Sequence, residues 1–127
     1  MYKRQSHDFP GFYLTSSGHR LDWRVDSPTE VAAVVRARAG LGTDRHALIV
    51  ANPLPPDQQL DPALHDAVLT AGLAALSTQG IRGKAVTPFL LEHFHRETGG
   101  ASLAVNTRLV LRNACLAAQL AVAITAT

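Results

Sequence analysis

Cysteine is almost absent from this chain of 127 residues, in which Cys115 stands alone. A single cysteine excludes an intrachain disulfide and any metal site built from several cysteines. Cys115 lies in an apolar, helix-like run, so the sequence predicts that it is a small buried core residue. Charge is also low: 17% of residues are charged, the net charge is +2, and the basic residues are scattered. Nucleic-acid binders cluster such charge on one face, so we expect no nucleic-acid partner.

Long apolar runs are missing as well. No uninterrupted stretch of about 18 apolar residues exists, which predicts no membrane span. The first residues lack an apolar signal-peptide core, so we expect a cytoplasmic protein. Met1–Gln5 read like translated sequencing-adapter DNA, and we interpret residues 1–5 as a non-native scar preceding one domain at residues 6–127.

Histidine is plentiful, but its spacing does not favour a metal site. His93 and His95 are two positions apart on a predicted helix and therefore point about 200° apart around it. A metal-binding pair on a helix needs a spacing of three or four residues. Catalytic patterns are absent too: we find no Ser-His-Asp order, nucleophile elbow or glycine-rich phosphate loop. The sequence predicts neither a metal ligand nor a catalytic residue in this chain.

Helix starts are clearly marked. Ser27 followed by Pro28 and Glu30 forms a capping box, which predicts a helix to about Ala39. Three further helices are predicted in the same way: Asp61 caps one that ends at Gln79, Thr87 caps one that ends before Gly99, and the last runs from about Ser102 to Ile124.

Two segments have strand-like patterns. Residues 20–25 alternate polar and apolar, and residues 46–51 form an apolar run typical of a strand covered on both faces. Two strands are too few to form a sheet that helices cover on both sides. The sequence therefore predicts an α/β fold class, specifically the C-terminal part of an α/β/α layered fold with an incomplete sheet flanked by helices.

Four polar residues are candidates for ligand contact. Asn52 ends the apolar strand, where open α/β sheets place ligands, but Asn before Pro also simply shapes turns. Lys84 precedes a helix start and could help to hold a phosphate, or it is a solvated loop lysine. Asn106 and Asn113 share one helix face and could reach a polar ligand or satisfy neighbouring backbone.

Several short motifs, in order, resemble one enzyme family. They are Phe12-Tyr13, Arg24-Val25-Asp26-Ser27, Val50-Ala51-Asn52-Pro53, Gly83-Lys84, Thr87-Pro88-Phe89-Leu90-Leu91, Thr98-Gly99-Gly100, Ser102-Leu103, Asn106 and Asn113-Ala114. This ordered set resembles the C-terminal region of the pseudouridine-5'-phosphate glycosidases, also called the indigoidine synthase A-like family. The resemblance covers roughly residues 8–124.

The resemblance implies an activity, cofactor and partners. The implied reaction is reversible cleavage of the C–C glycosidic bond of pseudouridine 5'-phosphate to uracil and ribose 5-phosphate. It implies a homotrimer, a divalent metal (usually manganese), and a lysine that forms a Schiff base with the sugar, which supplies an electron sink for breaking a C–C bond. No nucleic acid or membrane is implied.

The family's reactive lysine, metal-binding aspartate and acid/base glutamate belong to a part of the family pattern upstream of this chain. Only Asn106 carries over as a substrate-binding residue, on the base side; Asn52 and Lys84 remain secondary candidates. The family usually has two adjacent asparagines here, and Arg112 stands in place of the first. This difference weakens the case for a functional role of Asn113. We therefore expect a glycosidase fragment that is inactive alone. The alternative is a stand-alone, non-catalytic binding or oligomerisation module derived from that fold.

Overall fold

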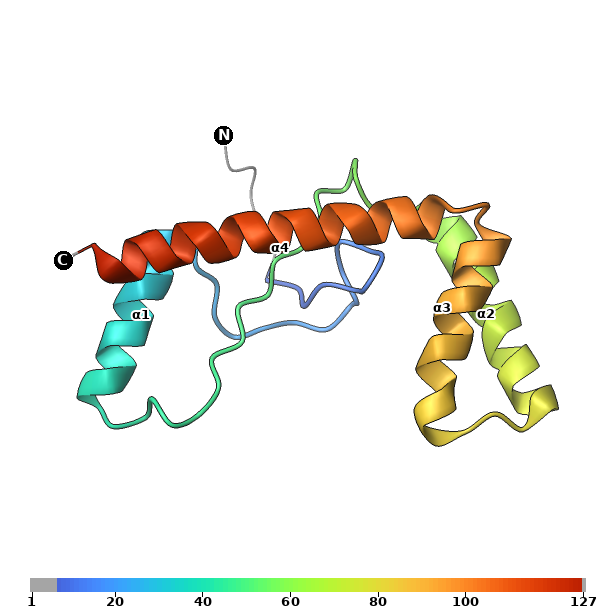
Figure 1. The fold of residues 1–127 in the computed structure, drawn as a ribbon, viewed down its shortest axis with the longest axis horizontal. Helices are drawn as coiled ribbons and strands as arrows, with labels where there is room; N and C mark the ends of the chain where they lie inside the picture. The colour runs from blue at the N-terminus through green and yellow to red at the C-terminus, as the bar shows by residue number, and fades with distance from the viewer. Residues whose placement is uncertain (1–6, 127) are drawn as a thin grey trace. The chain divides into compact units, whose positions relative to one another are not determined.

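The structure, a computed structural model, describes residues 7–126, and the proposed scar at residues 1–5 lies outside them. Helices account for most of the ordered elements (Figure 1). They are α1 (Pro28–Gly40), α2 (Pro62–Gln79), the short 3₁₀ helix η1 (Gly83–Ala85), α3 (Val86–Glu97) and α4 (Ala101–Thr125).

The chain divides into two compact units. Within the described residues, the α1 unit comprises residues 7–10, Ser16–Pro53 and residues 110–126. The α2–α3 unit comprises Gly11–Thr15 and Leu54–Leu109. Helix α4 is continuous, with residues up to Leu109 in the α2–α3 unit and residues from Val110 on in the α1 unit.

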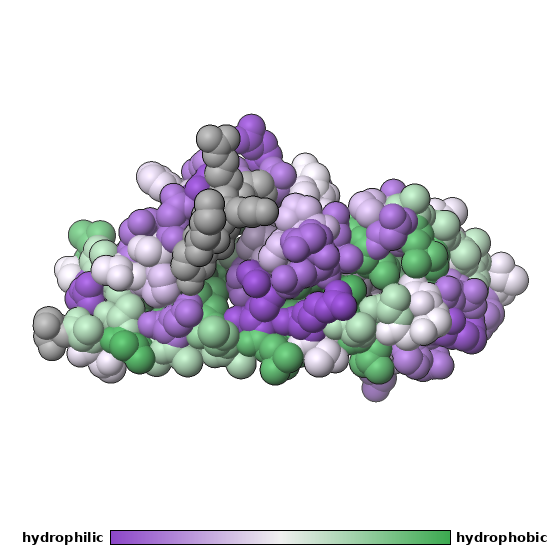
Figure 2. All heavy atoms as spheres, turned by 90° about the horizontal axis from the view of Figure 1, so that it is seen from above, coloured by the Kyte–Doolittle hydropathy of each residue, from purple (hydrophilic) through white to green (hydrophobic). Residues whose placement is uncertain are grey.

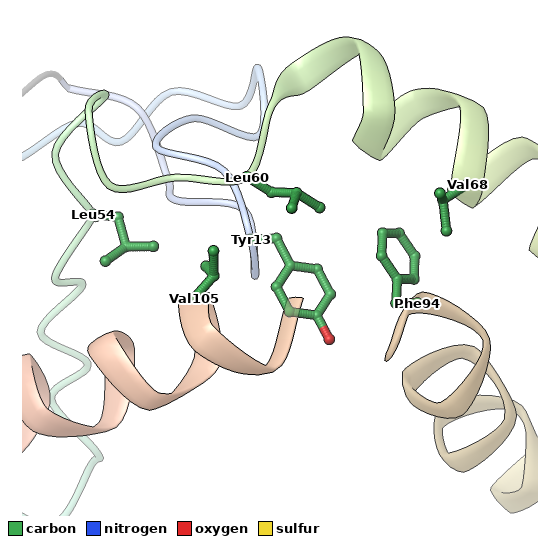
Figure 3. Close-up of a cluster of buried hydrophobic side chains, with 6 residues drawn as sticks. All are labelled: Tyr13, Leu54, Leu60, Val68, Phe94 and Val105. Atoms are coloured by element: carbon green, nitrogen blue, oxygen red, sulfur yellow. The ribbon is translucent and has the colours of Figure 1, made fainter. Parts of the chain in front are cut away.

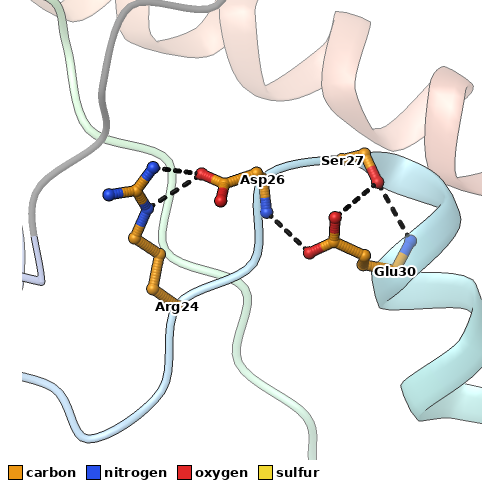
Figure 4. A network of polar contacts seen from close by, with 4 residues as sticks. All are labelled: Arg24, Asp26, Ser27 and Glu30. Carbon is orange, nitrogen blue, oxygen red and sulfur yellow. Dashed lines mark hydrogen bonds and ion pairs between the residues drawn. The ribbon is translucent and has the colours of Figure 1, made fainter.

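The start of α1 follows its predicted cap (Figure 4). The Glu30 backbone N–H donates to Ser27 Oγ at 3.2 Å. In return, Glu30 Oε2 accepts from the backbone N–H of Asp26 at 2.9 Å, one residue earlier than in a standard capping box. Arg24 pairs with Asp26 in the same network. The bond to Ser27 satisfies an amide that the first helical turn would otherwise leave without a partner, and the bond from Asp26 fixes the chain that leads into the helix.

The predicted bounds of α2 are confirmed, whereas the predicted cap of α3 is wrong. Asp61 Oδ1 accepts from the Leu64 N–H at 2.8 Å, and Gly80 ends α2 with a φ of 64°. Helix α3 begins at Val86, directly after η1, with Ala85 at the cap position and no side-chain cap. Because η1 already supplies a helical turn, α3 starts before Thr87, which lies inside its first turn.

The two predicted strands do not form within the described residues. Residues 21–25 and 46–51 carry no strand, and Arg20 forms only an isolated antiparallel bridge with Asp8. A strand exists only where a neighbouring strand accepts its hydrogen bonds. Among the described residues, the first segment meets only the single bridge at Arg20, and no strand lies beside residues 46–51. Trp23 is accordingly 89% exposed and Ile49 is 80% exposed.

The α2–α3 unit contains a well-defined core (Figure 3). Helices α2 and α3 pack as antiparallel neighbours. Tyr13, from the Gly11–Thr15 segment, packs against Phe94 of α3 with ring centroids 5.0 Å apart. The full cluster is Tyr13, Leu54, Leu60, Val68, Phe94 and Val105. A backbone bond from the Leu60 N–H to the Tyr13 carbonyl, at 2.9 Å, holds the Gly11–Thr15 segment in place.

Helix α4 is much less buried than the sequence predicts. Cys115 is exposed, so its predicted place in a core is wrong for this chain. The face of α4 that carries Cys115 has no covering element among the described residues. By length and composition alone α4 could cross a membrane, but one such helix is weak support because core helices of water-soluble proteins pass the same test. The absence of a membrane span stays a prediction.

Candidate functional site

An open pocket of about 190 Å³ lies in the α2–α3 unit and includes Asn106. Its lining residues are Tyr13, Leu91, His95, Ser102, Leu103 and Asn106. Two helices supply most of them: Leu91 and His95 are one turn apart on α3, and Ser102, Leu103 and Asn106 lie on the first two turns of α4. The Asn106 side chain is half-buried.

Tyr13 and Ser102 are the most deeply buried of these residues. Tyr13 is 6% exposed and Ser102 is 1% exposed. Burial raises the pKa of the Tyr13 phenol, and a hydrogen bond with Ser102 offsets part of that rise. Ser102 is held in turn by a bond from its backbone N–H to Thr98 Oγ1 at 3.0 Å. The pocket therefore has a pair of neutral, hydrogen-bonded hydroxyl groups beside apolar walls.

The two histidines of α3 have different environments. His93 is buried, its Nε2 lies 3.1 Å from the Val68 carbonyl oxygen, and its Nδ1 lies 3.2 Å from Arg96 Nη2. Because the guanidinium can only donate, His93 accepts at Nδ1 and donates from Nε2. His95 is exposed and lines the pocket. The two histidines thus lie on different faces of α3, as their predicted separation of about 200° around the helix requires. His93 joins α3 to α2 through its contact with Val68.

Asn52 and Asn113 lie together in the α1 unit. Asn52 Nδ2 donates to Asn113 Oδ1 at 3.0 Å. The bond joins the end of the 46–51 segment to the second half of α4 and leaves one amide oxygen and one amide nitrogen for other partners. This geometry is compatible with both interpretations of Asn52, as a residue that shapes the turn and as a residue that contacts a ligand.

Lys84 lies in η1 and is exposed. No hydrogen bond or ion pair joins its ammonium group to another described residue. Lys84 does not line the pocket that contains Asn106. Its position immediately before the uncapped first turn of α3 is the only structural feature that connects it with phosphate binding.

The described residues do not fit a divalent metal. Among residues 7–126, no group of three or more histidine, cysteine, aspartate or glutamate side chains is arranged to hold an ion. A hard cation such as manganese prefers several oxygen ligands. We therefore derive no chemical step through a metal in this chain.

Sequence reasoning missed the pocket partners of Asn106. His95 entered only as a rejected metal ligand, and Tyr13 only as part of a motif. Leu91 and His95 are four positions apart, so helical periodicity could have placed them on one face. Nothing in the sequence alone could bring Tyr13, about ninety positions away, to the same place.

Comparison with known proteins assigns the chain to a family. The family model described as indigoidine synthase A like protein matches residues 1–123. The chain belongs to this family.

Its relatives are considerably longer proteins. It is 64% identical over 115 residues to a pseudouridine-5'-phosphate glycosidase of Salinispora tropica, covering 91% of this chain and 36% of that protein. Proteins of the same name from Frankia alni and Streptomyces griseus are 58% and 56% identical, covering 91% of this chain and 32% and 36% of those proteins. The chain spans about a third of the length of these curated relatives and matches their C-terminal part.

The fold is also found among solved structures. The prealnumycin C-glycosynthase AlnA, determined in complex with ribulose 5-phosphate, superposes with a TM-score of 0.84 at 22% identity. The match covers 96% of this chain and 40% of AlnA. It confirms the predicted fold class, a part of an α/β fold, although residues 7–126 contain no strand of their own.

Proposed function

We propose that this chain is the C-terminal portion of a pseudouridine-5'-phosphate glycosidase and supplies part of the substrate pocket of the intact enzyme. The whole enzyme would reversibly cleave the C–C glycosidic bond of pseudouridine 5'-phosphate to uracil and ribose 5-phosphate. Support comes from family membership and from the names of relatives up to 64% identical. The observation that carries the proposal is the placement of Asn106 in a pocket.

The chemistry of this pocket suits a planar, polar ring. Leu91, Leu103 and the Tyr13 ring offer apolar walls, as small-molecule sites usually do. The Asn106 amide offers both a donor and an acceptor. The imide edge of uracil alternates acceptor and donor, so one amide can form two complementary hydrogen bonds with it. We assign Asn106 to the base side of the substrate.

Asn52 and Lys84 are secondary candidates for substrate contact. Lys84 could pair with the phosphate, supported by its exposed ammonium group just before the start of α3, which no side chain caps. Asn52 could hold a polar substrate edge through the amide atoms that its bond to Asn113 leaves unused. If these assignments are correct, substituting either residue by alanine in the intact enzyme should raise its KM for pseudouridine 5'-phosphate rather than abolish turnover.

The remaining features of the intact enzyme are proposals as well. We propose that it uses manganese or another divalent metal, whose ligands lie outside the described residues, and that it assembles as a homotrimer in the cytoplasm. Metal dependence of turnover and sedimentation of a full-length relative would test these two points. For the chain alone we expect no release of uracil, since no described residue offers a reactive lysine paired with a metal site.

A hybrid protein gives the direct test. The hybrid carries residues 8–127 of this chain in place of the matching C-terminal region of the Salinispora tropica relative. Asn106→Ala should lower kcat/KM for uracil release by about ten- to a hundredfold, because losing a buried hydrogen-bond partner costs about 1–3 kcal/mol. Thr107→Ala, at the exposed neighbouring position, is the control. Unchanged turnover and substrate affinity in Asn106→Ala would overturn the assignment.

The alternative, a stand-alone binding or oligomerisation module, makes a different prediction. Such a module should be a stable, soluble protein by itself, with its apolar side chains covered. The exposure of Trp23 and Ile49 favours the glycosidase portion instead. A sharp, cooperative melt of the isolated chain would favour the module.

A further inference from the structure

The pocket that contains Asn106 has a second side chain able to bind a polar group, His95. Helix α3 supplies Leu91 and His95 to the lining. Helix α4 supplies Leu103 and Asn106, in addition to the buried Ser102. Figure 2 shows hydrophobic and hydrophilic side chains interspersed over the molecular surface, and the lining of this pocket is mixed in the same way. A ligand in the pocket therefore meets exposed polar groups from two helices.

The backbone at His95 is fixed, whereas its ring is available to a ligand. The His95 carbonyl accepts from the Gly100 N–H at 3.0 Å, within the turn that joins α3 to α4. A Cβ added to Gly100 would lie 3.9 Å from His95 Cε1, so the imidazole lies beside the same turn. No hydrogen bond or ion pair joins its ring nitrogens to another described residue. His93, by contrast, is buried with both ring nitrogens in contact with partners.

The base that we assign to this pocket needs more donors than Asn106 supplies. The imide edge of uracil carries one N–H flanked by two carbonyl oxygens. The Asn106 amide can accept from the N–H and donate to one carbonyl, which leaves the other carbonyl without a partner. A buried acceptor without a partner costs free energy, so a second donor is needed.

His95 is the side chain of the lining that can supply this donor. The Tyr13 and Ser102 hydroxyls are buried and bond to each other. A neutral imidazole has one N–H to donate and an imidazolium has two. The His95 ring is exposed and lines the same pocket as Asn106.

We propose that His95 donates a hydrogen bond to the base carbonyl that Asn106 leaves unpaired, and so contributes to the affinity of the pocket for the base. The inference rests on the proposed function, in which this pocket holds the base side of the substrate. His95 and Asn106 then bind the imide edge together, one from each helix. The sugar phosphate takes no part in this contact.

The hybrid, assayed for joining uracil to ribose 5-phosphate, tests the role of His95. His95→Ala should raise the KM for uracil about three- to tenfold, as the loss of one hydrogen bond does, and leave the KM for ribose 5-phosphate unchanged. His95→Gln keeps an N–H donor and should restore most of the lost affinity. Glu92→Ala, at an exposed position of the same helix outside the pocket lining, is the matched control and should change neither KM.

Bases that carry sulfur in place of one oxygen test the contact itself. A thiocarbonyl accepts a hydrogen bond more weakly than a carbonyl does. One of 2-thiouracil and 4-thiouracil should therefore bind the hybrid less tightly than uracil, measured as competitive inhibition. In His95→Ala this difference should shrink, because the side chain that donates to the substituted position is gone.

The outcomes separate the role of His95 from the proposed function. An unchanged KM for uracil in His95→Ala, an equal rise in both KM values, or a thiouracil difference that His95→Ala leaves intact overturns the role of His95 alone. A hybrid that binds uracil without turnover contradicts the proposed function. The dissociation constant of uracil from equilibrium dialysis then replaces KM in the comparison of the variants. A hybrid that neither turns over nor binds uracil overturns both.

Discussion

At the scale of single residues, Gly72 shows how closely α2 and α3 pack. A Cβ added there would lie 2.9 Å from His93 Cδ2 and 3.0 Å from Leu90 Cδ2. His93 cannot move away freely, because both of its ring nitrogens have partners. Gly72→Ala should therefore destabilise the α2–α3 unit by about 1–3 kcal/mol, as overpacking does, despite the higher helix propensity of alanine. Hydrogen exchange of α2 amides would measure the loss.

Gly40 provides the matched control for this substitution. It also lies in a helix, at the end of α1, and a Cβ there would meet nothing within 4 Å. Gly40→Ala should leave exchange in α2 unchanged. If both alanine variants behave alike, the close packing of Gly72 against His93 has no energetic consequence.

The Tyr13 phenol makes a second prediction at this scale. Burial raises its pKa in the folded chain, so the folded state holds the phenol proton more tightly than the unfolded state does. This contribution to stability is fully present below the ordinary tyrosine pKa of about 10 and is lost as pH rises through the higher folded pKa. In a Tyr2→Phe background, phenolate absorbance should titrate above that ordinary value and return to it in urea. A midpoint at the ordinary value in the folded chain would contradict burial.

At the scale of elements, α1 depends on its cap. Ser27 satisfies the Glu30 amide of its first turn, Glu30 holds the Asp26 amide just before the helix, and few tertiary contacts of the α1 unit reinforce it. Ser27→Ala should cost about 0.5–2 kcal/mol of helix stability, which exchange of the first α1 amides and helical circular dichroism would detect. Thr29→Ala, at an exposed position two residues after Ser27, serves as the control. Equal effects of both variants would show that the cap is not what holds this end.

The same elements show what the sequence predicts and what it does not. Helix starts at Ser27 and Asp61 could be predicted because a cap is a contact between residues three apart. The segment 46–51 could not form the predicted strand, because a strand requires a partner strand and none of residues 7–126 provides one beside it. For the pocket, Asn106 came from a resemblance, whereas its neighbours Tyr13 and His95 meet only through tertiary packing. The exposure of Cys115 likewise depends on what covers α4, which no local pattern encodes.

At the scale of the whole molecule, the two units should differ in stability. The α2–α3 unit contains the aromatic and aliphatic cluster, and the α1 unit leaves apolar side chains open, including Val122 at 69% exposure. Regions with few buried contacts open first, so the isolated chain should lose exchange protection in α1 at lower urea than in α2 and α3. The isolated chain should also bind a hydrophobic dye, aggregate readily and melt broadly. In the hybrid, the α1 amides should gain protection and unfold together with those of α2. Simultaneous loss of protection in α1 and α2 of the isolated chain, with no dye binding, would show that the α1 unit is stable without the upstream part.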